Sequence, residues 1–132
     1  MTGMIPDPSK KRVVLVADDE ANLALLLKGN LEEYGFDVVI AADGEDVLAK
    51  FDFEKPDVVI LDVEMPKMNG WGVCESIRRI SGSNSRPVIL ILSAYAQPED
   101  IKKGLSLGAN RYFTKPFKMK ELIETIVNLL AE

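Results

Sequence analysis

The sequence predicts an α/β fold in which five helices cover both faces of a doubly wound, five-stranded parallel sheet. Short apolar runs without polar alternation recur along the chain, which is typical of strands buried on both faces. A helical pattern follows each of these runs. The length of 132 residues fits one domain of about 100–150 residues and excludes an eight-stranded barrel, which needs about 250.

The first strand–helix–strand unit is expected within residues 13–41. Residues 13–17 (VVLVA) are apolar and rich in β-branched side chains, which predicts a buried strand. Apolar side chains then recur every three or four positions, as on one face of a helix, at Leu23, Leu26, Leu27, Leu31 and Tyr34. Gly35 is the expected end of that helix, and residues 36–41 (FDVVIA) are predicted to form the second strand.

The middle of the chain repeats the same alternation. Residues 44–51 are predicted to form a short helix, and Pro56 introduces a buried strand at residues 58–61. A helix over residues 71–80 and a strand over residues 88–92 follow. The side chains of this helix that are expected to point inward are Val73, Cys74, Ile77 and Ile80.

The last third contains two more helices and one strand. Pro98 suits the first turn of a helix over residues 98–107, and Gly108 suits its end. Residues 111–114 are predicted to form the fifth strand, and residues 119–130 the final helix. The side chains of the final helix that are expected to point inward are Leu122, Ile123, Ile126, Val127 and Leu130.

Five strands linked by right-handed crossovers favour the flavodoxin-like strand order 2-1-3-4-5 over a Rossmann-type sheet. Residues 1–11 contain prolines and lysines and are predicted to be a mobile leader, so that one domain covers residues 12–132. The sequence shows no signal peptide and no apolar run long enough to cross a bilayer, so we expect a cytoplasmic protein without membrane insertion.

The composition excludes several classes of function. There is no histidine, which removes Ser-His-Asp and Cys-His triads and the common zinc sites. Cys74 is the single cysteine, so no internal disulfide can form, and its place on a predicted inward stripe suggests an inert core thiol. The net charge of −5 argues against direct nucleic-acid binding over a broad surface.

Polar side chains end four of the five predicted strands. Ligands of an open parallel sheet bind at the carboxyl ends of its strands, near the point where the strand order reverses, here between strands 1 and 3. Each polar residue alone has an ordinary explanation as a helix cap, a turn residue or a solvated charge. Their convergence on one edge instead favours a site, made of Asp18, Asp19, Asp62, Ser93 and Lys115.

The chemistry of this set points to a metal ion and a phosphoryl group. Two carboxylates about 4 Å apart repel by roughly 4 kcal/mol at an effective dielectric constant of 20, so three in one pocket require raised pKa values or a cation. Oxygen ligands with open positions suit Mg²⁺, which commonly also binds phosphate oxygens. Lys115 and Ser93 suit phosphoryl oxygens, and an aspartate can attack phosphorus.

Four stretches carrying these residues resemble one known family. The sequence is similar to response regulator receiver domains of two-component signalling, of the single-domain chemotaxis type. The resemblance runs from about Lys11 to the C-terminus and is strongest in residues 13–20 (VVLVADDE), 56–70 (PDVVILDVEMPKMNG), 88–94 (VILILSA) and 108–117 (GANRYFTKPF).

The resemblance implies a role for each acidic residue. Asp62 would be the phospho-acceptor, receiving a phosphoryl group from a histidine of a sensor kinase or a histidine phosphotransfer protein. Asp19 and Asp62 would bind Mg²⁺ directly, together with the backbone carbonyl of Glu64, while Asp18 would hold the ion mainly through water. The protein would then be a phosphoprotein of a phosphorelay rather than an enzyme.

The resemblance also implies a switch. Lys115 would contact the phosphoryl oxygens, Ser93 would hydrogen-bond the phosphate after transfer, and Tyr112 would turn inward as the switch aromatic residue. Pro116 would follow a cis peptide bond. The readout surface for a downstream protein, and for a possible homodimer, would be helix 4, strand 5 and helix 5, with candidate exposed residues Lys102, Lys103, Arg111, Lys118 and Glu121.

Two further residues, Glu64 and Tyr95, border the predicted site. Glu64 and Tyr95 follow Asp62 and Ser93 by two residues, and in the family these positions border the site and influence how long the acyl phosphate lasts. We expect the Glu64 side chain to contact Lys115 or to orient water. Trp71 is interpreted as a packing residue, like Met65 and Cys74.

The sequence leaves three alternatives open. A haloacid dehalogenase-type phosphatase would need an Asp-x-Asp motif, whereas Asp18 and Asp19 are adjacent. A flavodoxin-like cofactor carrier would need a Ser/Thr/Gly-rich phosphate loop after strand 1. A pseudo-receiver that is never phosphorylated would act only as an interaction module. The domain can stand alone or belong to a longer regulator.

Overall fold

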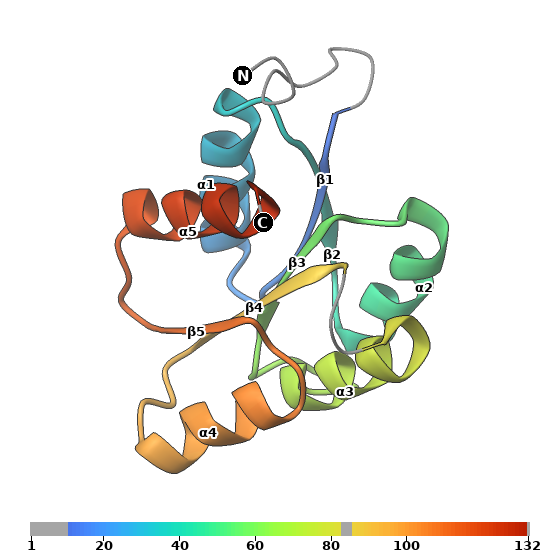
Figure 1. Cartoon of the computed structure of the whole chain (residues 1–132), viewed down its shortest axis with the longest axis vertical. Coiled ribbons are helices and arrows are strands. Elements are labelled where there is room, and N and C mark those ends of the chain that lie inside the picture. Colours follow the sequence, from blue (N-terminus) through green and yellow to red (C-terminus); the bar gives the residue numbers. More distant parts are fainter. Residues whose placement is uncertain (1–10, 83–85, 132) are drawn as a thin grey trace.

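Strands and helices alternate along the chain in the computed structural model, which describes residues 11–82 and 86–131 (Figure 1). The strands are β1 (Val13–Ala17), β2 (Asp37–Ala41), β3 (Val58–Asp62), β4 (Val88–Ser93) and β5 (Arg111–Thr114). The helices are α1 (Ala21–Glu33), α2 (Gly44–Glu54), α3 (Gly70–Ser81), α4 (Pro98–Ser106) and α5 (Met119–Ala131). Of the predicted mobile leader, all but Lys11 lies outside the described residues.

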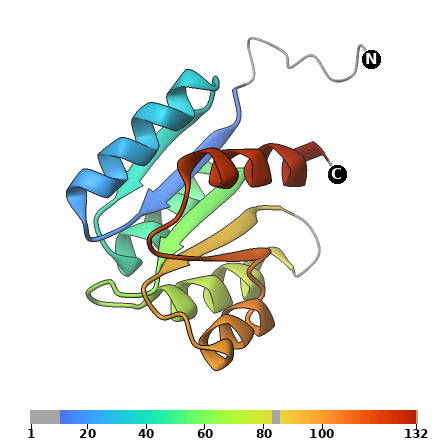
Figure 2. The ribbon, with the colours of Figure 1, turned by 90° about the vertical axis from the view of Figure 1, so that its left-hand side faces the viewer.

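The five strands form one parallel sheet in the order β2-β1-β3-β4-β5. Helices α1 and α5 cover one face, and α2, α3 and α4 cover the other (Figure 2). The predicted fold class and strand order are therefore confirmed. In this topology β1 and β3 are neighbours although α1, β2 and α2 separate them in the chain, so their carboxyl ends lie side by side.

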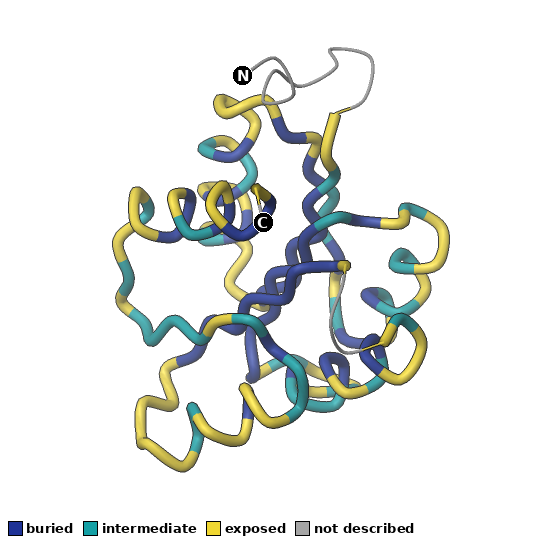
Figure 3. The backbone as a smooth tube through the Cα atoms, viewed as in Figure 1, coloured by how far each residue is buried: buried dark blue, intermediate teal, exposed yellow. Residues whose placement is uncertain are grey.

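Two apolar clusters lie on opposite faces of the sheet, and the central strands supply both. Figure 3 shows that these central strands are buried. Val14 and Val16 of β1 pack toward α1 and α5, whereas Leu15 and Ala17 pack toward α2 and α3. Successive residues of a strand point to opposite faces, so a strand covered on both sides must be apolar throughout. This is why the strands read as unbroken apolar runs.

Side-chain caps fix where two of the helices begin. The side chain of Asp43 accepts a hydrogen bond from the amide of Asp46 at 2.8 Å and so starts α2. Asn69 caps α3 in the same way through the amide of Gly72 at 2.9 Å. The predicted end of α2 is three residues early, because the helix continues to Glu54.

Four side chains predicted to point inward are instead exposed. Their exposed fractions are 56% for Leu26, 60% for Tyr34, 70% for Ile80 and 43% for Val127. The buried stripes are narrower than the apolar patterns and are shifted around the helix axes. Leu27 and Leu31 of α1 are buried as predicted, and the additional buried residues are Ala24 in α1, Arg78 in α3 and Leu129 in α5.

The buried Arg78 explains the shift in α3. Its Nε donates to the carbonyl of Gly108 at 2.9 Å, and its Nη2 donates to Asn110 Oδ1 at 2.8 Å. A buried guanidinium needs such acceptors, and the loop between α4 and β5 supplies them.

The predicted cis bond before Pro116 is confirmed, and the bond between Arg86 and Pro87 is also cis.

None of the helices within residues 11–82 and 86–131 is both long and apolar enough to cross a membrane. Cys74 is fully buried, and burial raises the pKa of its thiol to about 11. The thiol therefore stays protonated near neutral pH, which agrees with the inert core role predicted for it.

Two glycines are expected to respond oppositely to a methyl group. Gly108 has a φ of +113°, and a Cβ there would overlap Arg78 Cγ, so Gly108→Ala should destabilise the fold by more than about 1 kcal/mol. Gly29 lies within α1 with open space around its Cα, so Gly29→Ala should stabilise by about 0.5–1 kcal/mol. Urea unfolding followed by circular dichroism measures both, and equal shifts would contradict the packing described for Gly108.

Candidate functional site

Three neighbouring strands leave the carboxyl edge of the sheet through the same local turn. In each turn a side-chain oxygen at the strand end accepts a hydrogen bond from the amide two residues later. The pairs are Asp18 with Glu20 at 2.9 Å, Asp62 with Glu64 at 3.2 Å and Ser93 with Tyr95 at 2.9 Å. Such side-chain turns replace the ladder bonds that end with the strand, and they fix the direction of each side chain.

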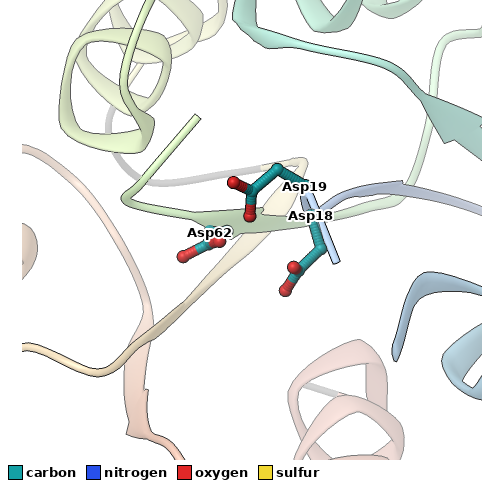
Figure 4. A group of neighbouring side chains, drawn as sticks. All are labelled: Asp18, Asp19 and Asp62. Atoms are coloured by element: carbon teal, nitrogen blue, oxygen red, sulfur yellow. The ribbon is translucent and has the colours of Figure 1, made fainter. Parts of the chain in front are cut away.

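Asp18, Asp19 and Asp62 form one cluster of carboxylates at the ends of β1 and β3 (Figure 4). One oxygen from each lies within 4.8 Å of the others. Asp18 and Asp62 are buried, whereas Asp19 is exposed, so the cluster has two fixed ligands and one side open to solvent. The sequence predicted this grouping from the strand order.

Lys115 supplies the positive charge nearest to these acids. Its Nζ lies 3.0 Å from Asp18 Oδ2, 3.0 Å from Glu20 Oε1 and 3.5 Å from Asp62 Oδ2. Burial lowers the pKa of Lys115, but the hydrogen bonds to Asp18 and Glu20 outweigh this, so the pKa is raised overall. The ammonium therefore stays charged. The contact with Glu20 was not predicted from the sequence.

Asp62 carries the most perturbed carboxyl in the site. Burial is the largest cause, and repulsion by Asp18 adds to it, raising the pKa of Asp62 from the ordinary 3.8 to about 7. The hydrogen bond from the amide of Glu64 and the charge of Lys115 act in the opposite direction without cancelling the effect. A cation bound nearby would therefore stabilise the ionised form of this carboxyl and displace its proton.

The donor set fits a hard divalent cation. The three side chains of the cluster offer carboxylate oxygens, and Lys115 alone does not balance the charge of Asp18, Asp19, Glu20 and Asp62. Oxygen ligands with an open, solvated side suit Mg²⁺, which keeps several of its waters. The cluster is thus consistent with the predicted metal site.

Ser93 and Tyr112 lie next to the cluster along β4 and β5. Ser93 is fully buried, and its carbonyl accepts from the amide of Lys115 at 2.8 Å. The Tyr112 hydroxyl donates to the carbonyl of Tyr95 at 2.8 Å, and its ring packs so closely on α4 that a Cβ at Gly104 would lie 2.9 Å from the ring. Burial raises the pKa of Tyr112, which keeps the hydroxyl protonated as a donor.

Glu64 does not contact Lys115 among the described ion pairs, so that part of our expectation is wrong. Its Oε2 instead accepts a hydrogen bond from the Tyr95 hydroxyl at 3.3 Å. Tyr95 is in turn stacked on Trp71, which the sequence suggested only as a packing residue. The placement of the Glu64 carbonyl at the metal stays a prediction.

Comparison with known proteins identifies the family. The model of the response regulator receiver domain matches residues 14–127, which is most of the chain. This chain belongs to the response regulator receiver domain family. The family signals through phosphoryl groups in two-component systems, is typically non-enzymatic and implies a histidine kinase as partner.

Several relatives of this receiver domain are similar over nearly its whole length. The probable transcriptional regulator ycf27 of Cyanophora paradoxa is 43% identical over 120 residues, covering 91% of this chain and 48% of that protein. The receiver domain of Francisella response regulator 1452 has a TM-score of 0.83 and 35% identity, covering 91% of this chain and 96% of that one. Chemotaxis protein CheY4 of Vibrio cholerae has a TM-score of 0.82 and 32% identity, covering 90% and 98%.

The receiver spans about half the length of curated relatives such as the ycf27 protein, and it matches nearly all of the chemotaxis protein. The expected likeness to chemotaxis receivers is therefore found. The family match also favours the receiver interpretation over a haloacid dehalogenase-type phosphatase or a cofactor carrier.

The raised pKa of Asp62 predicts how the free energy of unfolding changes with pH. Between about pH 4 and about pH 7 the folded receiver holds a proton on Asp62 that the unfolded chain has already lost, so its stability falls as pH rises through this window. Asp62→Asn removes the effect. Without divalent cations, the stability of Asp62→Asn relative to the natural protein should therefore increase by more than about 1 kcal/mol from pH 4 to pH 8.

Urea midpoints at the two pH values measure this difference, and Asp52→Asn on the exposed surface of α2 is the matched control. A difference that stays the same at both pH values would mean that Asp62 ionises normally in the fold. Adding Mg²⁺ at pH 8 should stabilise the natural protein more than Asp62→Asn.

Proposed function

We propose that this receiver domain accepts a phosphoryl group on Asp62 from a histidine of a sensor kinase or histidine phosphotransfer protein, with Mg²⁺ as its cofactor. The observation that carries the proposal is the set of charges around Asp62, namely two further aspartates within 4.8 Å and the Lys115 ammonium at 3.5 Å. Phosphoryl transfer depends mainly on positioning and on charge neutralisation, and this arrangement offers both.

Each oxygen of Asp62 has a separate environment. Oδ1 accepts from the amide of Glu64, which holds the carboxylate at the end of β3, and Oδ2 faces Lys115. An Asp62 oxygen forms a bond to phosphorus while the phosphorus–nitrogen bond of the donor phosphohistidine breaks, and its electron pair stays on the imidazole. Lys115 stabilises negative charge on the phosphoryl oxygens during this step.

Asp18, Asp19 and Asp62, with the backbone carbonyl of Glu64, are the groups we propose for holding Mg²⁺, Asp18 mainly through water. When bound, the ion neutralises the carboxylates and the incoming phosphoryl oxygens. Because Lys115 already reaches Asp18 and Asp62, the chain supplies part of that neutralisation itself.

We propose that Ser93 and Tyr112 carry the signal from the phosphoryl group. Asp62 pairs with Leu92 in the register of β3 and β4, so Ser93 is the next residue along β4, where its hydroxyl can donate to a phosphoryl oxygen. Tyr112 links β5 to the segment before α4 through the Tyr95 carbonyl. A shift from 1:99 to 99:1 between two arrangements needs about 5.5 kcal/mol, a sum that several charge-assisted contacts can reach.

The output surface in this proposal is formed by α4, β5 and α5. Five candidate residues there are exposed in the fold, and we propose them as contacts for a downstream protein or a second copy of the domain: Lys102, Lys103, Arg111, Lys118 and Glu121. A cytoplasmic location follows from the proposed donor, because histidine kinases draw the phosphoryl group from ATP.

The proposal predicts a single phosphoryl adduct when the protein is incubated with acetyl phosphate and Mg²⁺. Intact-mass spectrometry should find it stable in acid, labile in base, and missing from Asp62→Asn and from samples with excess EDTA, because both the acceptor and the cation are required. Asp52→Asn, on exposed α2, should label like the natural protein.

An adduct that forms equally well in EDTA would contradict a metal-assisted transfer. No adduct in the natural protein would favour a pseudo-receiver that acts only through protein contacts. An adduct that survives Asp62→Asn would place the acceptor elsewhere.

A further inference from the structure

A bridge of side chains joins two loops at the carboxyl edge of the sheet. The Tyr95 hydroxyl donates to Glu64 Oε2 at 3.3 Å, and the Tyr95 ring is stacked on Trp71, with centroids 5.8 Å apart and planes inclined by 13°. Lys103 Nζ lies 4.1 Å from the centroid of the Trp71 ring. The bridge therefore connects the loop after β3, the loop after β4, the first turn of α3 and the middle of α4.

Two residues of the bridge, Glu64 and Tyr95, are tied to the proposed phosphorylation site through their backbone. The amide of Glu64 donates to Asp62 Oδ1, and the amide of Tyr95 donates to Ser93 Oγ. Strands β3 and β4 are paired neighbours in the sheet. A side-chain link from Glu64 to Tyr95 consequently joins the loops that follow these two strands, next to the ends where Asp62 and Ser93 lie.

Trp71 lies where it can hold this link in place. The Tyr95 side chain belongs to a loop and is 41% exposed, and the Glu64 hydrogen bond alone leaves its ring free on both faces. Stacking on Trp71 supplies a fixed surface for the ring, and the nearby ammonium of Lys103 is attracted to the indole face. Trp71 itself is half-buried and is anchored by the first turn of α3.

We propose that Trp71 is a positioning residue which, by fixing Tyr95 against Glu64, shields phosphorylated Asp62 from water and lengthens the lifetime of the acyl phosphate. The inference rests on the proposed function. In the hydrolysis that limits this lifetime, a water oxygen bonds to phosphorus and the bond to the Asp62 oxygen breaks. The electron pair stays on the carboxylate, and the attacking water releases a proton to solvent.

Two consequences of the bridge slow this reaction. The link narrows the approach between the ends of β3 and β4, and it occupies the Glu64 carboxylate with the Tyr95 hydroxyl. Once released, the carboxylate is free to accept a hydrogen bond from a water molecule and orient it toward phosphorus. Because the stack is the only aromatic contact of Tyr95 among the described residues, loss of Trp71 should release both effects together.

The test follows the decay of the adduct after acetyl phosphate is removed, in the full chain with Mg²⁺, by intact mass. Trp71→Ala and Tyr95→Phe should each shorten the half-life by about two- to tenfold, the range expected for losing one stacking or hydrogen-bonding contact. Trp71→Phe, which keeps an aromatic surface, should restore most of the lifetime. Phe53→Ala, at an 82% exposed position of α2, is the control and should leave it unchanged.

A double-mutant cycle distinguishes a positioning role from general damage. If Trp71 acts through Tyr95, adding Trp71→Ala to Tyr95→Ala should change the half-life no further. Effects that multiply, or a Trp71→Ala lifetime equal to that of the natural protein, would overturn the inference while leaving the proposed function intact. A natural protein that takes no label would overturn the proposed function, and this inference with it.

The stack can also be tested without phosphorylation. Trp71 is the single tryptophan, so its fluorescence reports on this position alone. Tyr95→Ala should increase quenching of Trp71 by acrylamide, because the removed ring covers part of the indole. Unchanged quenching would show that the two rings do not stack in solution and would overturn the inference.

Discussion

The repulsion among carboxylates at one edge of the sheet is the constraint on which this structure depends. Asp18 and Asp62 are both buried, and each lies close to the same ammonium of Lys115. Two such charges at short distance cost several kcal/mol unless a cation or a proton intervenes. Here Lys115 supplies one charge and a proton on Asp62 partly supplies another, which leaves the site ready to exchange that proton for a divalent ion. Phosphoryl chemistry follows from the same imbalance, because the cation that balances the acids also attracts phosphate oxygens.

The strand order and the turns at the strand ends fix where these carboxylates lie. Parallel strands end at a common edge, and the strand order makes β1 and β3 neighbours. The repeated turn at Asp18, Asp62 and Ser93 then orients three side chains from three strands in one direction. The buried core packs against the strands on both faces, so the site residues lie at the ends of well-packed elements. The loops after β3 and β4 carry Glu64 and Tyr95, and the first turn of α3 carries Trp71.

Much of this site could be predicted from the sequence, because the apolar runs end at Asp18, Asp62, Ser93 and Lys115 and the topology brings strand ends together. Contacts between loops could not be predicted in this way. The ion pair of Glu20 with Lys115 and the stack of Tyr95 on Trp71 depend on the paths of the chain after β1 and β4. The apolar spacing also did not predict how wide the buried stripe of each helix is. Ile80 is exposed because Arg78 takes the inward position, where its Nε donates to the carbonyl of Gly108 and its Nη2 donates to the side chain of Asn110.

The central claim is that Asp62 holds a proton near neutral pH which a divalent cation replaces. Calorimetric titration with Mg²⁺ in buffers of different ionisation enthalpy measures both the binding and the protons released. The account predicts one Mg²⁺ per chain, with net proton release near pH 7 that disappears in Asp62→Asn and at about pH 9, where Asp62 is already ionised. Binding without proton release at pH 7, or Mg²⁺ affinity that is unaffected by Asp62→Asn and Asp19→Asn, would contradict it.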